Sequence, residues 1–126
     1  MSERKDGSMK LLKDSDLNLA NRKRFFGEIG ISKKKIISTG IIHGTNVKII
    51  DSTSPEIVPK TDGLITKYKN IFLCITIADC IPVYFFEPEQ KIIAIIHCGW
   101  RGIVGGIIKN TIEKIQSLME IPKNYK

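Results

Sequence analysis

Apolar residues along this 126-residue chain follow two different periods, and the change from one to the other predicts the order of its elements. Between residues 36 and 96 they come in short runs separated by glycine, proline and charged residues, which is typical of strands joined by turns. Near the C-terminus they recur at the spacing of one helix face. The positions that share this face are Val104, Ile108, Ile112, Ile115 and Met119. Asp14 or Asp16 is expected to cap a further helix over about residues 17–27, near the N-terminus.

The strand region divides into several apolar segments. The continuous run over residues 71–78 is typical of a strand buried on both faces, and the charged turn over residues 87–90 predicts a hairpin. Residues 52–60 contain two prolines and predict a loop. The predicted strands are 36–42, 47–50, 63–66, 71–78, 82–86 and 91–96. Helices flanking several strands indicate a mixed α/β or α+β fold, with a central mixed sheet covered by helices.

Length and composition indicate one domain, spanning residues 1–126. A chain of this length can bury one hydrophobic core, and 42% hydrophobic with 26% charged residues is typical of a soluble globular protein. No apolar run approaches the roughly 18 residues of a membrane helix, and residues 1–13 lack the apolar stretch of a signal peptide. We therefore expect a cytoplasmic protein with no membrane partner. Its three cysteines fit reduced thiols or metal ligands better than disulfides.

The net charge of +7 is concentrated near the N-terminus. Residues 1–35 carry ten Lys and Arg against five Asp and Glu, whereas residues 36–126 carry ten against eight. One interpretation is a nucleic-acid-binding patch, and the other is a solvated helix face. We favour the solvated face, because no aromatic residues are interleaved with the basic ones to stack on bases. The positive field can still attract an anionic substrate such as phosphate.

The candidate chemistry lies at the ends of predicted strands. His43 and His97, the only histidines of the chain, and Cys80 each stand at the end of an apolar run beside small residues, where loops often carry functional groups. Two imidazoles and a thiolate suit zinc with one open coordination position. If the strands that lead to Cys80 and His97 share a sheet, the two side chains meet at the same edge. Spacings of 37 and 17 residues exclude a zinc-finger motif.

Residue chemistry alone leaves two other interpretations of Cys80. It is a small hydrophobe in the core, or it is a nucleophile with His97 as its base and Asp79 as a neighbour, which would make a Cys/His hydrolase or transferase. Cys74 lies within an apolar strand and is expected in the core. Cys98 follows His97, so in an extended strand its side chain points to the opposite face.

Four further polar and aromatic residues have structural interpretations beside functional ones. Trp100 is expected in the core or in a pocket wall. The guanidinium of Arg101 can bind phosphate, or it can form an ion pair with Asp79 or Asp62. Asp62 stands before a glycine and is expected as a turn residue. Arg22 is expected on a helix surface.

Four short motifs occur along the chain in the order of a known family: IHGTNV at 42–47, TDGLIT at 61–66, ADCIP at 78–82 and HCGWRG at 97–102. Together they resemble the laccase-domain proteins, named multicopper polyphenol oxidases and also described as purine nucleoside phosphorylases. The resemblance runs from about residue 2 to residue 120 and includes Asn21-Arg22. It implies a YfiH-like sandwich of mixed α/β sheets, shared with bacterial toxins of the CNF type that carry a Cys/His pair.

The resemblance also implies a metal, usually zinc with copper as the alternative, on His43, Cys80 and His97. It implies phosphorolysis of adenosine, inosine, guanosine and methylthioadenosine, with some deamination of adenosine. Members of the family are considerably longer and continue past the last helix, so we expect a chain that is incomplete at its C-terminus. Multicopper oxidase chemistry does not fit, because several coppers need many imidazoles and this chain has two.

We therefore predict a zinc-dependent purine nucleoside phosphorylase that takes purine nucleosides and phosphate. Arg22 and Arg101 are the candidates for binding phosphate. Cys80 and Asp79 are the candidates for catalysis, with Asp79 passing protons. The alternatives are a metal-free Cys80/His97 hydrolase or transferase, an inactive fragment, and a nucleic-acid-binding module. The sequence leaves a homo-oligomer open.

Overall fold

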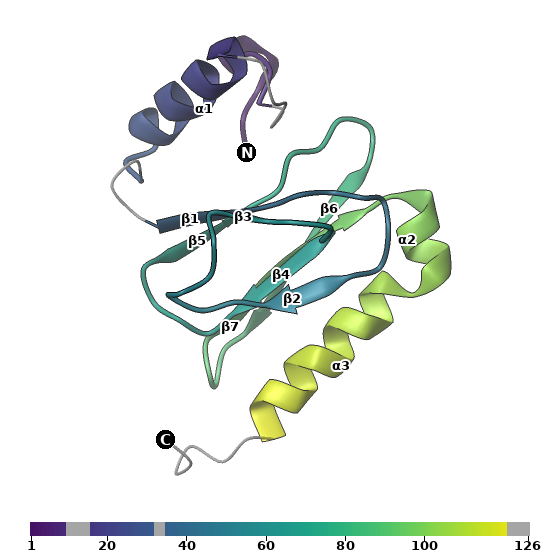
Figure 1. The fold of residues 1–126 in the computed structure, drawn as a ribbon. Coiled ribbons are helices and arrows are strands. Elements are labelled where there is room, and N and C mark those ends of the chain that lie inside the picture. The colour runs from purple at the N-terminus through teal and green to yellow at the C-terminus, as the bar shows by residue number, and fades with distance from the viewer. Residues whose placement is uncertain (10–15, 32–34, 121–126) are drawn as a thin grey trace. The chain divides into compact units, whose positions relative to one another are not determined.

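Residues 1–9, 16–31 and 35–120 are described by this structure, a computed structural model. The chain divides into two compact units, residues 1–35 and residues 36–126, and each is described by itself. The expectation of a single domain stays a prediction. Figure 1 labels the elements of both units.

The N-terminal unit contains a 3-10 turn, η1 (Arg4–Asp6), and one α-helix, α1 (Asp16–Glu28). The helix predicted over residues 17–27 is confirmed. Of the two residues expected to cap it, Asp14 lies outside the described residues.

Arg22 and its neighbour Asn21 hold the segment that precedes α1. Asn21 donates from Nδ2 to the carbonyl oxygen of Ser8 at 3.1 Å, and Arg22 donates from Nη1 to that of Met9 at 3.0 Å. The guanidinium also lies over the ring of Phe26, 5.3 Å from its centroid. The expectation of Arg22 on the helix surface is therefore wrong: its side chain is 7% exposed, because a planar guanidinium can bond at its edge and stack with its face.

The larger unit forms two sheets and two helices within its described residues. A small sheet has the strand order β3-β1-β5, and a larger one the order β2-β4-β7-β6. Strand β1 is parallel to β3 and β2 is parallel to β4, whereas β7 is antiparallel to both of its neighbours. The strands are β1 (Lys35–Thr39), β2 (Val47–Ile49), β3 (Ile57–Val58), β4 (Gly63–Thr66), β5 (Ile71–Cys74), β6 (Ile81–Glu87) and β7 (Ile92–Cys98). The predicted mixed α+β class is confirmed.

Two of the strand predictions are corrected. The run over residues 71–78 forms a strand only as far as Cys74, and Phe72 within it is 37% exposed, so it is not a strand buried on both faces. It lies in the small sheet, where its outer face is open. The expected loop over residues 52–60 contains β3, because Val58 packs inward and pairs with β1. The predicted hairpin of β6 and β7 is confirmed.

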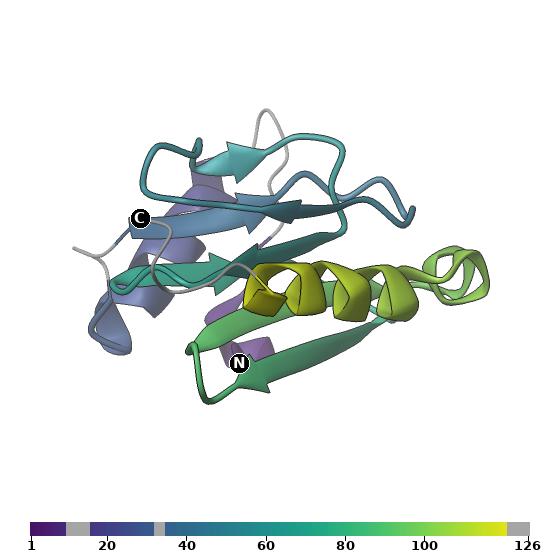
Figure 2. The ribbon, with the colours of Figure 1, turned by 90° about the horizontal axis from the view of Figure 1, so that it is seen from below.

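Three layers give the unit its two hydrophobic cores. The larger sheet lies between the small sheet on one side and α3 (Ile107–Glu120) on the other, as Figures 1 and 2 show from two directions. The inter-sheet core consists of Ile37, Ile50, Val58, Leu64, Ile71 and Ile95. The helix-side core consists of Val47, Ile65, Ile92, Ala94, Ile96, Cys98, Ile107, Ile115 and Leu118. Alternate residues of β4 and β7 serve the two cores, as the two-residue period of a strand requires.

The predicted C-terminal helix face is wrong at most of its positions. Gly106 adopts φ 90°, which ends α2 (Trp100–Gly105) and starts α3 in a new phase. The buried positions of α3 are Ile107, Thr111, Ile115 and Leu118. Val104 is instead 81% exposed, and Ile108 and Ile112 also reach the surface. Only Ile115 of the predicted face is buried, while Met119 packs partly against the helix-side core. Pro122, which is expected to end the helix because its ring cannot continue it, lies outside the described residues.

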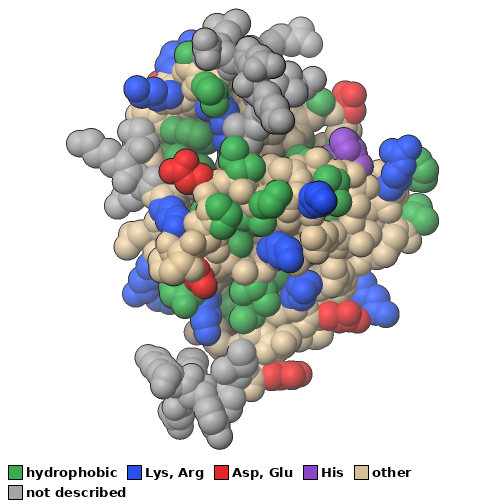
Figure 3. Space-filling model, in the orientation of Figure 1, with side chains coloured by type: hydrophobic (Ala, Val, Ile, Leu, Met, Phe, Trp, Pro, Cys, Tyr) green, Lys and Arg blue, Asp and Glu red, His purple; other side chains and the backbone are tan. Residues whose placement is uncertain are grey.

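The described helices are all too short or too polar to cross a bilayer. Figure 3 shows Lys and Arg side chains distributed over the drawn face, together with hydrophobic and acidic ones.

Candidate functional site

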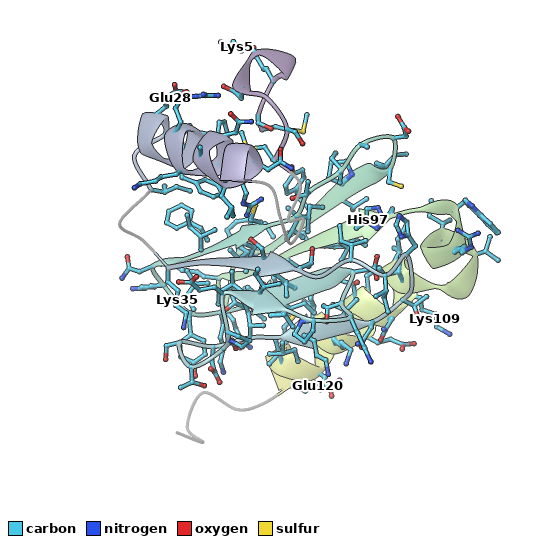
Figure 4. The ribbon with its side chains drawn as sticks, turned by 45° about the horizontal axis from the view of Figure 1, so that its top comes forward. Lys5, Glu28, Lys35, His97, Lys109 and Glu120 are labelled. Carbon is cyan, nitrogen blue, oxygen red and sulfur yellow. The ribbon has the colours of Figure 1, made fainter. Side chains whose placement is uncertain are left out.

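The three side chains expected to bind a metal converge on Gly99. A Cβ atom added at Gly99 would lie 3.4 Å from Cε1 of His97, 3.5 Å from Sγ of Cys80 and 3.9 Å from Cδ2 of His43. The two imidazole rings meet edge to face, with their centroids 5.1 Å apart. Glycine leaves open the space that all three side chains border. Figure 4 labels His97 near the end of β7, close to α2.

The pairing of β6 with β7 explains how Cys80 reaches His97. Ile81 is opposite Cys98 and Pro82 is opposite His97 in the antiparallel ladder, so Cys80 arrives beside Gly99. The expected reason for the meeting was different and is wrong: β5, the strand that leads toward Cys80, lies in the small sheet, whereas β7 lies in the larger one. The strand that follows Cys80 makes the connection.

Asp62 is the centre of the site's hydrogen bonding. Its carboxylate is fully buried and accepts from the backbone N–H groups of Ile42 at 3.2 Å, His43 at 3.0 Å and Gly44 at 3.0 Å. Its Oδ2 also lies 2.9 Å from Nδ1 of His97. The backbones are joined as well, because the N–H of His97 donates to the carbonyl oxygen of Asp62 at 2.7 Å. The expectation of a simple turn residue is therefore wrong.

The loop that carries His43 is shaped by these bonds. His43 adopts φ 61°, the left-handed region, which turns successive N–H groups toward one carboxylate. The imidazole itself is exposed, in contrast to that of His97, which is 3% exposed. The ring of His97 is thus hydrogen-bonded to Asp62, whereas His43 is bonded to Asp62 through its backbone N–H.

The helix α2 closes the other side of the loop. A Cβ atom at Gly102 would lie 2.9 Å from the carbonyl oxygen of Gly44, so the helix approaches the loop as closely as only glycine permits. Asn110 of α3 donates from Nδ2 to the carbonyl oxygen of Thr45 at 2.8 Å. The loop is therefore held on one side by Asp62, directly before β4, and on the other by the close approach of Gly102 and the side chain of Asn110.

The other predicted site residues are placed more openly. Asp79 is exposed directly before Cys80. Arg101 is exposed in the first turn of α2, and its guanidinium lies 4.5 Å from the ring centroid of Trp100. Trp100 is 67% exposed, so the expectation of a core position is wrong. Arg22 belongs to the N-terminal unit, where its described contacts are with that unit.

The three cysteines have different surroundings. Cys98 is buried in the helix-side core, on the face opposite His97 as expected. Burial raises the pKa of the Cys98 thiol, and the nearby Cys80 raises it further. Cys74 is half-buried and belongs to neither core, which corrects the expectation of a core residue. Cys80 is half-buried at the site.

The donor set fits zinc although no cage is preassembled. Among the described residues, no three His, Cys, Asp or Glu side chains are already placed as metal ligands. Two imidazoles and one thiol nevertheless border a single point, and Asp62 holds the Nδ1 side of His97 so that Nε2 faces away from it. A carboxylate behind a ligand histidine is the common arrangement of zinc sites. Exposed His43 and half-buried Cys80 have room to change rotamer.

Comparison with known families gives a match over most of the chain. The family model described as multi-copper polyphenol oxidoreductase laccase matches residues 8–125. Purine nucleoside phosphorylase Cgl2154/cg2365 of Corynebacterium glutamicum is 34% identical over 101 residues, covering 79% of this chain and 41% of that protein. Purine nucleoside phosphorylase RC0672 of Rickettsia conorii is 40% identical over 74 residues, covering 59% of this chain and 30% of that protein. The chain therefore matches less than half the length of these curated relatives.

Solved structures show the same fold. YlmD from Geobacillus stearothermophilus superposes with a TM-score of 0.82 at 26% identity, covering 90% of this chain and 46% of that one. A hypothetical protein YfiH from Bacillus licheniformis superposes with a TM-score of 0.76 at 24% identity, covering 81% and 41%. The expected YfiH-like sandwich is confirmed.

Proposed function

Since the chain belongs to the multi-copper polyphenol oxidoreductase laccase family, whose curated relatives are named purine nucleoside phosphorylases, we propose that it takes part in zinc-dependent phosphorolysis of purine nucleosides. The proposed substrates are adenosine, inosine, guanosine and methylthioadenosine, together with phosphate. The observation that carries the proposal is the convergence of His43, Cys80 and His97 on Gly99. Those three side chains are the proposed zinc ligands, with copper as the alternative metal.

The reaction divides among the chain's residues as follows. Phosphorolysis breaks the bond between C1′ of the sugar and a purine nitrogen, forms a bond between C1′ and a phosphate oxygen, and returns a proton to the purine. Arg101 is proposed to bind the phosphate oxygens, because a guanidinium matches their geometry. Arg22, which belongs to the N-terminal unit, is proposed separately as a second phosphate-binding residue. Asp79 is proposed to pass the proton to the departing base. When bound, zinc supplies Lewis acidity to a substrate oxygen or nitrogen.

Deamination of adenosine is proposed as a side activity of the same site. In that reaction water adds to the purine carbon that carries the amino group, and ammonia leaves. We propose the cytoplasm as the location, since it keeps thiols such as Cys80 reduced and able to bind metal.

A second candidate function rests on the contact between Asp62 and His97. A buried carboxylate 2.9 Å from Nδ1 of a histidine, with Cys80 bordering the same open point, is also the arrangement of a thiol enzyme. In this alternative Cys80 is the nucleophile of a metal-free hydrolase or transferase, and His97 is its base. His43 then has no role in the chemistry.

Elemental analysis of the purified chain is the first test. The proposal predicts about one zinc per folded chain, lost in Cys80→Ser and kept in Cys74→Ser, a matched change of a half-buried cysteine outside the site. A folded chain without metal would contradict the zinc proposal for this chain.

Turnover then separates the two functions. Purine release from inosine that depends on phosphate supports phosphorolysis, and its loss in His43→Ala supports the metal enzyme. Activity that survives His43→Ala but not Cys80→Ser favours the thiol enzyme instead. Because the chain matches less than half the length of its curated relatives, zinc content is measured before turnover.

A further inference from the structure

We propose that Asp62 is a positioning residue that fixes the tautomer of His97 and, with the same carboxylate, the shape of the loop that carries His43. The inference deepens the proposed function, because it names the group that prepares the imidazole for a metal. It applies equally to the thiol enzyme, where the same nitrogen would act as the base.

The hydrogen-bond partners of the two carboxylate oxygens of Asp62 support this role. An ionised carboxylate can only accept hydrogen bonds. Oδ1 accepts from Ile42 and Gly44, whereas Oδ2 accepts from His43 and faces Nδ1 of His97. All four partners are donors or can be donors, and the carboxylate is fully buried, with no solvent to replace them.

The neutral tautomer of His97 follows from this geometry. With Oδ2 as an acceptor at 2.9 Å, Nδ1 must carry the proton, so Nε2 keeps its lone pair. A lone pair on nitrogen is what a metal or a proton-accepting role requires. Because His97 is 3% exposed, water cannot supply an alternative partner to Nδ1.

The same carboxylate couples the two histidines. Three successive N–H groups, from residues 42 to 44, point at Asp62, and the left-handed conformation of His43 makes this possible. Removing the charge therefore changes the ring of one histidine and the backbone of the other at once. No other described carboxylate forms a hydrogen bond or an ion pair with either histidine.

The variant Asp62→Asn tests the tautomer directly. If the amide oxygen takes the place of Oδ1, it keeps the bonds from Ile42 and Gly44 and leaves one N–H group, that of His43, facing the amide NH₂. In the place of Oδ2 it would instead leave two N–H groups facing the NH₂, those of Ile42 and Gly44. The amide nitrogen therefore faces Nδ1 of His97 and donates to it. We expect His97 to change to the Nε2–H tautomer. The same change from aspartate to asparagine produces the wrong histidine tautomer in the Ser-His-Asp triad of serine proteases.

Nitrogen-15 NMR at a pH where imidazole is neutral reads this change without any activity. The chain has two histidines, so His43→Ala leaves His97 as the only imidazole signal. The expected result is an Nδ1–H signal in His43→Ala and an Nε2–H signal in the double variant with Asp62→Asn. An Nε2–H tautomer already present with Asp62 intact would overturn the proposal, and this measurement needs no change at Asp62.

Zinc affinity, measured by competition with a chelator, is the second readout. Asp62→Asn is expected to bind zinc about 10–100-fold more weakly than the unchanged chain. The matched control is Asp51→Asn, since Asp51 also accepts a backbone N–H in a turn, that of Thr53 at 2.8 Å, away from the site. Equal affinity in Asp62→Asn and the unchanged chain would overturn the proposal.

The two proposals fail in different ways. If the unchanged chain binds no zinc but His97 is in the Nδ1–H tautomer, the metal function fails and the role of Asp62 stands. If the chain binds zinc but His97 is in the Nε2–H tautomer without it, the role of Asp62 fails and the metal function stands.

Discussion

Asp62, which directly precedes β4, is fully buried. Leu64 of β4 and Ile96 of the paired strand β7 are fully buried as well. The two apolar residues fill the layers on either side of the sheet, where burial itself is favourable. Asp62 has no such gain. Burying a charge is unfavourable unless it is fully bonded, and Asp62 has four partners that together satisfy it.

The apolar cores and the hydrogen-bond network of Asp62 therefore have different requirements: the cores stabilise the fold, and the network shapes the candidate site. The cores need side chains of the right size and period, and many apolar combinations satisfy them. The network of Asp62, His97 and the N–H groups of residues 42–44 needs each donor and acceptor in place, because a half-satisfied polar network is worse than an apolar one. Substitutions at the two places should therefore differ in size and in what they change.

Asp62→Ala is expected to have the largest effect. It leaves the buried Nδ1 of His97 and three part-buried backbone N–H groups without their acceptor, and removing one partner of a buried network typically costs about 3–5 kcal/mol. Urea denaturation followed by circular dichroism measures the change. A loss below about 1 kcal/mol would show that water replaces the carboxylate, and would remove the contrast between network and core.

Leu118→Ala tests the helix-side core. Leu118 is 8% exposed, and truncation of a buried leucine costs about 2–5 kcal/mol through lost burial and the cavity left behind. Leu19→Ala is the matched control, because Leu19 is 53% exposed on α1 and its loss is expected within about 0.5 kcal/mol. Zinc stoichiometry should stay unchanged in folded Leu118→Ala, and its loss there would show that core and site are not separable.

Gly102→Ala tests how closely α2 must approach the His43 loop. The new Cβ would lie 2.9 Å from the carbonyl oxygen of Gly44, which is backbone and cannot rotate away, so we expect a loss of about 1–3 kcal/mol. Gly27→Ala is the control, since nothing lies within 4 Å of its added Cβ. In that helix position alanine is expected to be neutral or to stabilise by up to about 1 kcal/mol.

A displaced loop should also move His43, so Gly102→Ala is expected to weaken zinc binding while Gly27→Ala leaves it unchanged. Equal unfolding free energies for the two alanine variants would contradict the close packing of α2 on Gly44. The comparison isolates the helix contact, because both changes add one methyl group to a glycine.

The hydrophobic pattern predicted most of the strands. It did not predict which face of α3 is buried or where β5 ends. The hairpin of β6 and β7 could be predicted, since two apolar runs flank a charged turn over residues 87–90. The buried face of α3 could not, because Gly106 resets the helical phase and isoleucine occupies both the buried position 107 and the exposed position 108. Residues 71–78 are apolar throughout, so the pattern did not indicate where β5 would leave its sheet.

Some residues of the candidate site could also be predicted from the sequence, and others could not. His43, Cys80 and His97 could be singled out because their chemistry is rare in this chain, and the structure brings them to one point. The role of Asp62 could not be predicted, because its partners lie 18–35 positions away and only the fold brings them near. The complete burial of the strand that follows Asp62 is likewise a property of the fold and is not marked in the sequence.

Gly99→Ala should have the smallest effect on stability and a large one on the site. Gly99 has φ −79° and ψ 164°, an extended conformation that alanine adopts readily, and the new methyl group would meet its neighbours at 3.4–3.9 Å, which is ordinary contact. We expect a change in unfolding free energy within about 0.5 kcal/mol. The methyl group would nevertheless occupy the point that His43, Cys80 and His97 border, so zinc should bind at least about tenfold more weakly, equal to about 1.4 kcal/mol. Calorimetric titration with zinc measures the affinity, and urea denaturation of the same preparation measures the free energy of unfolding. Unchanged zinc affinity with unchanged stability would mean that the three side chains meet by packing alone, and the site would then have to be sought elsewhere on the chain.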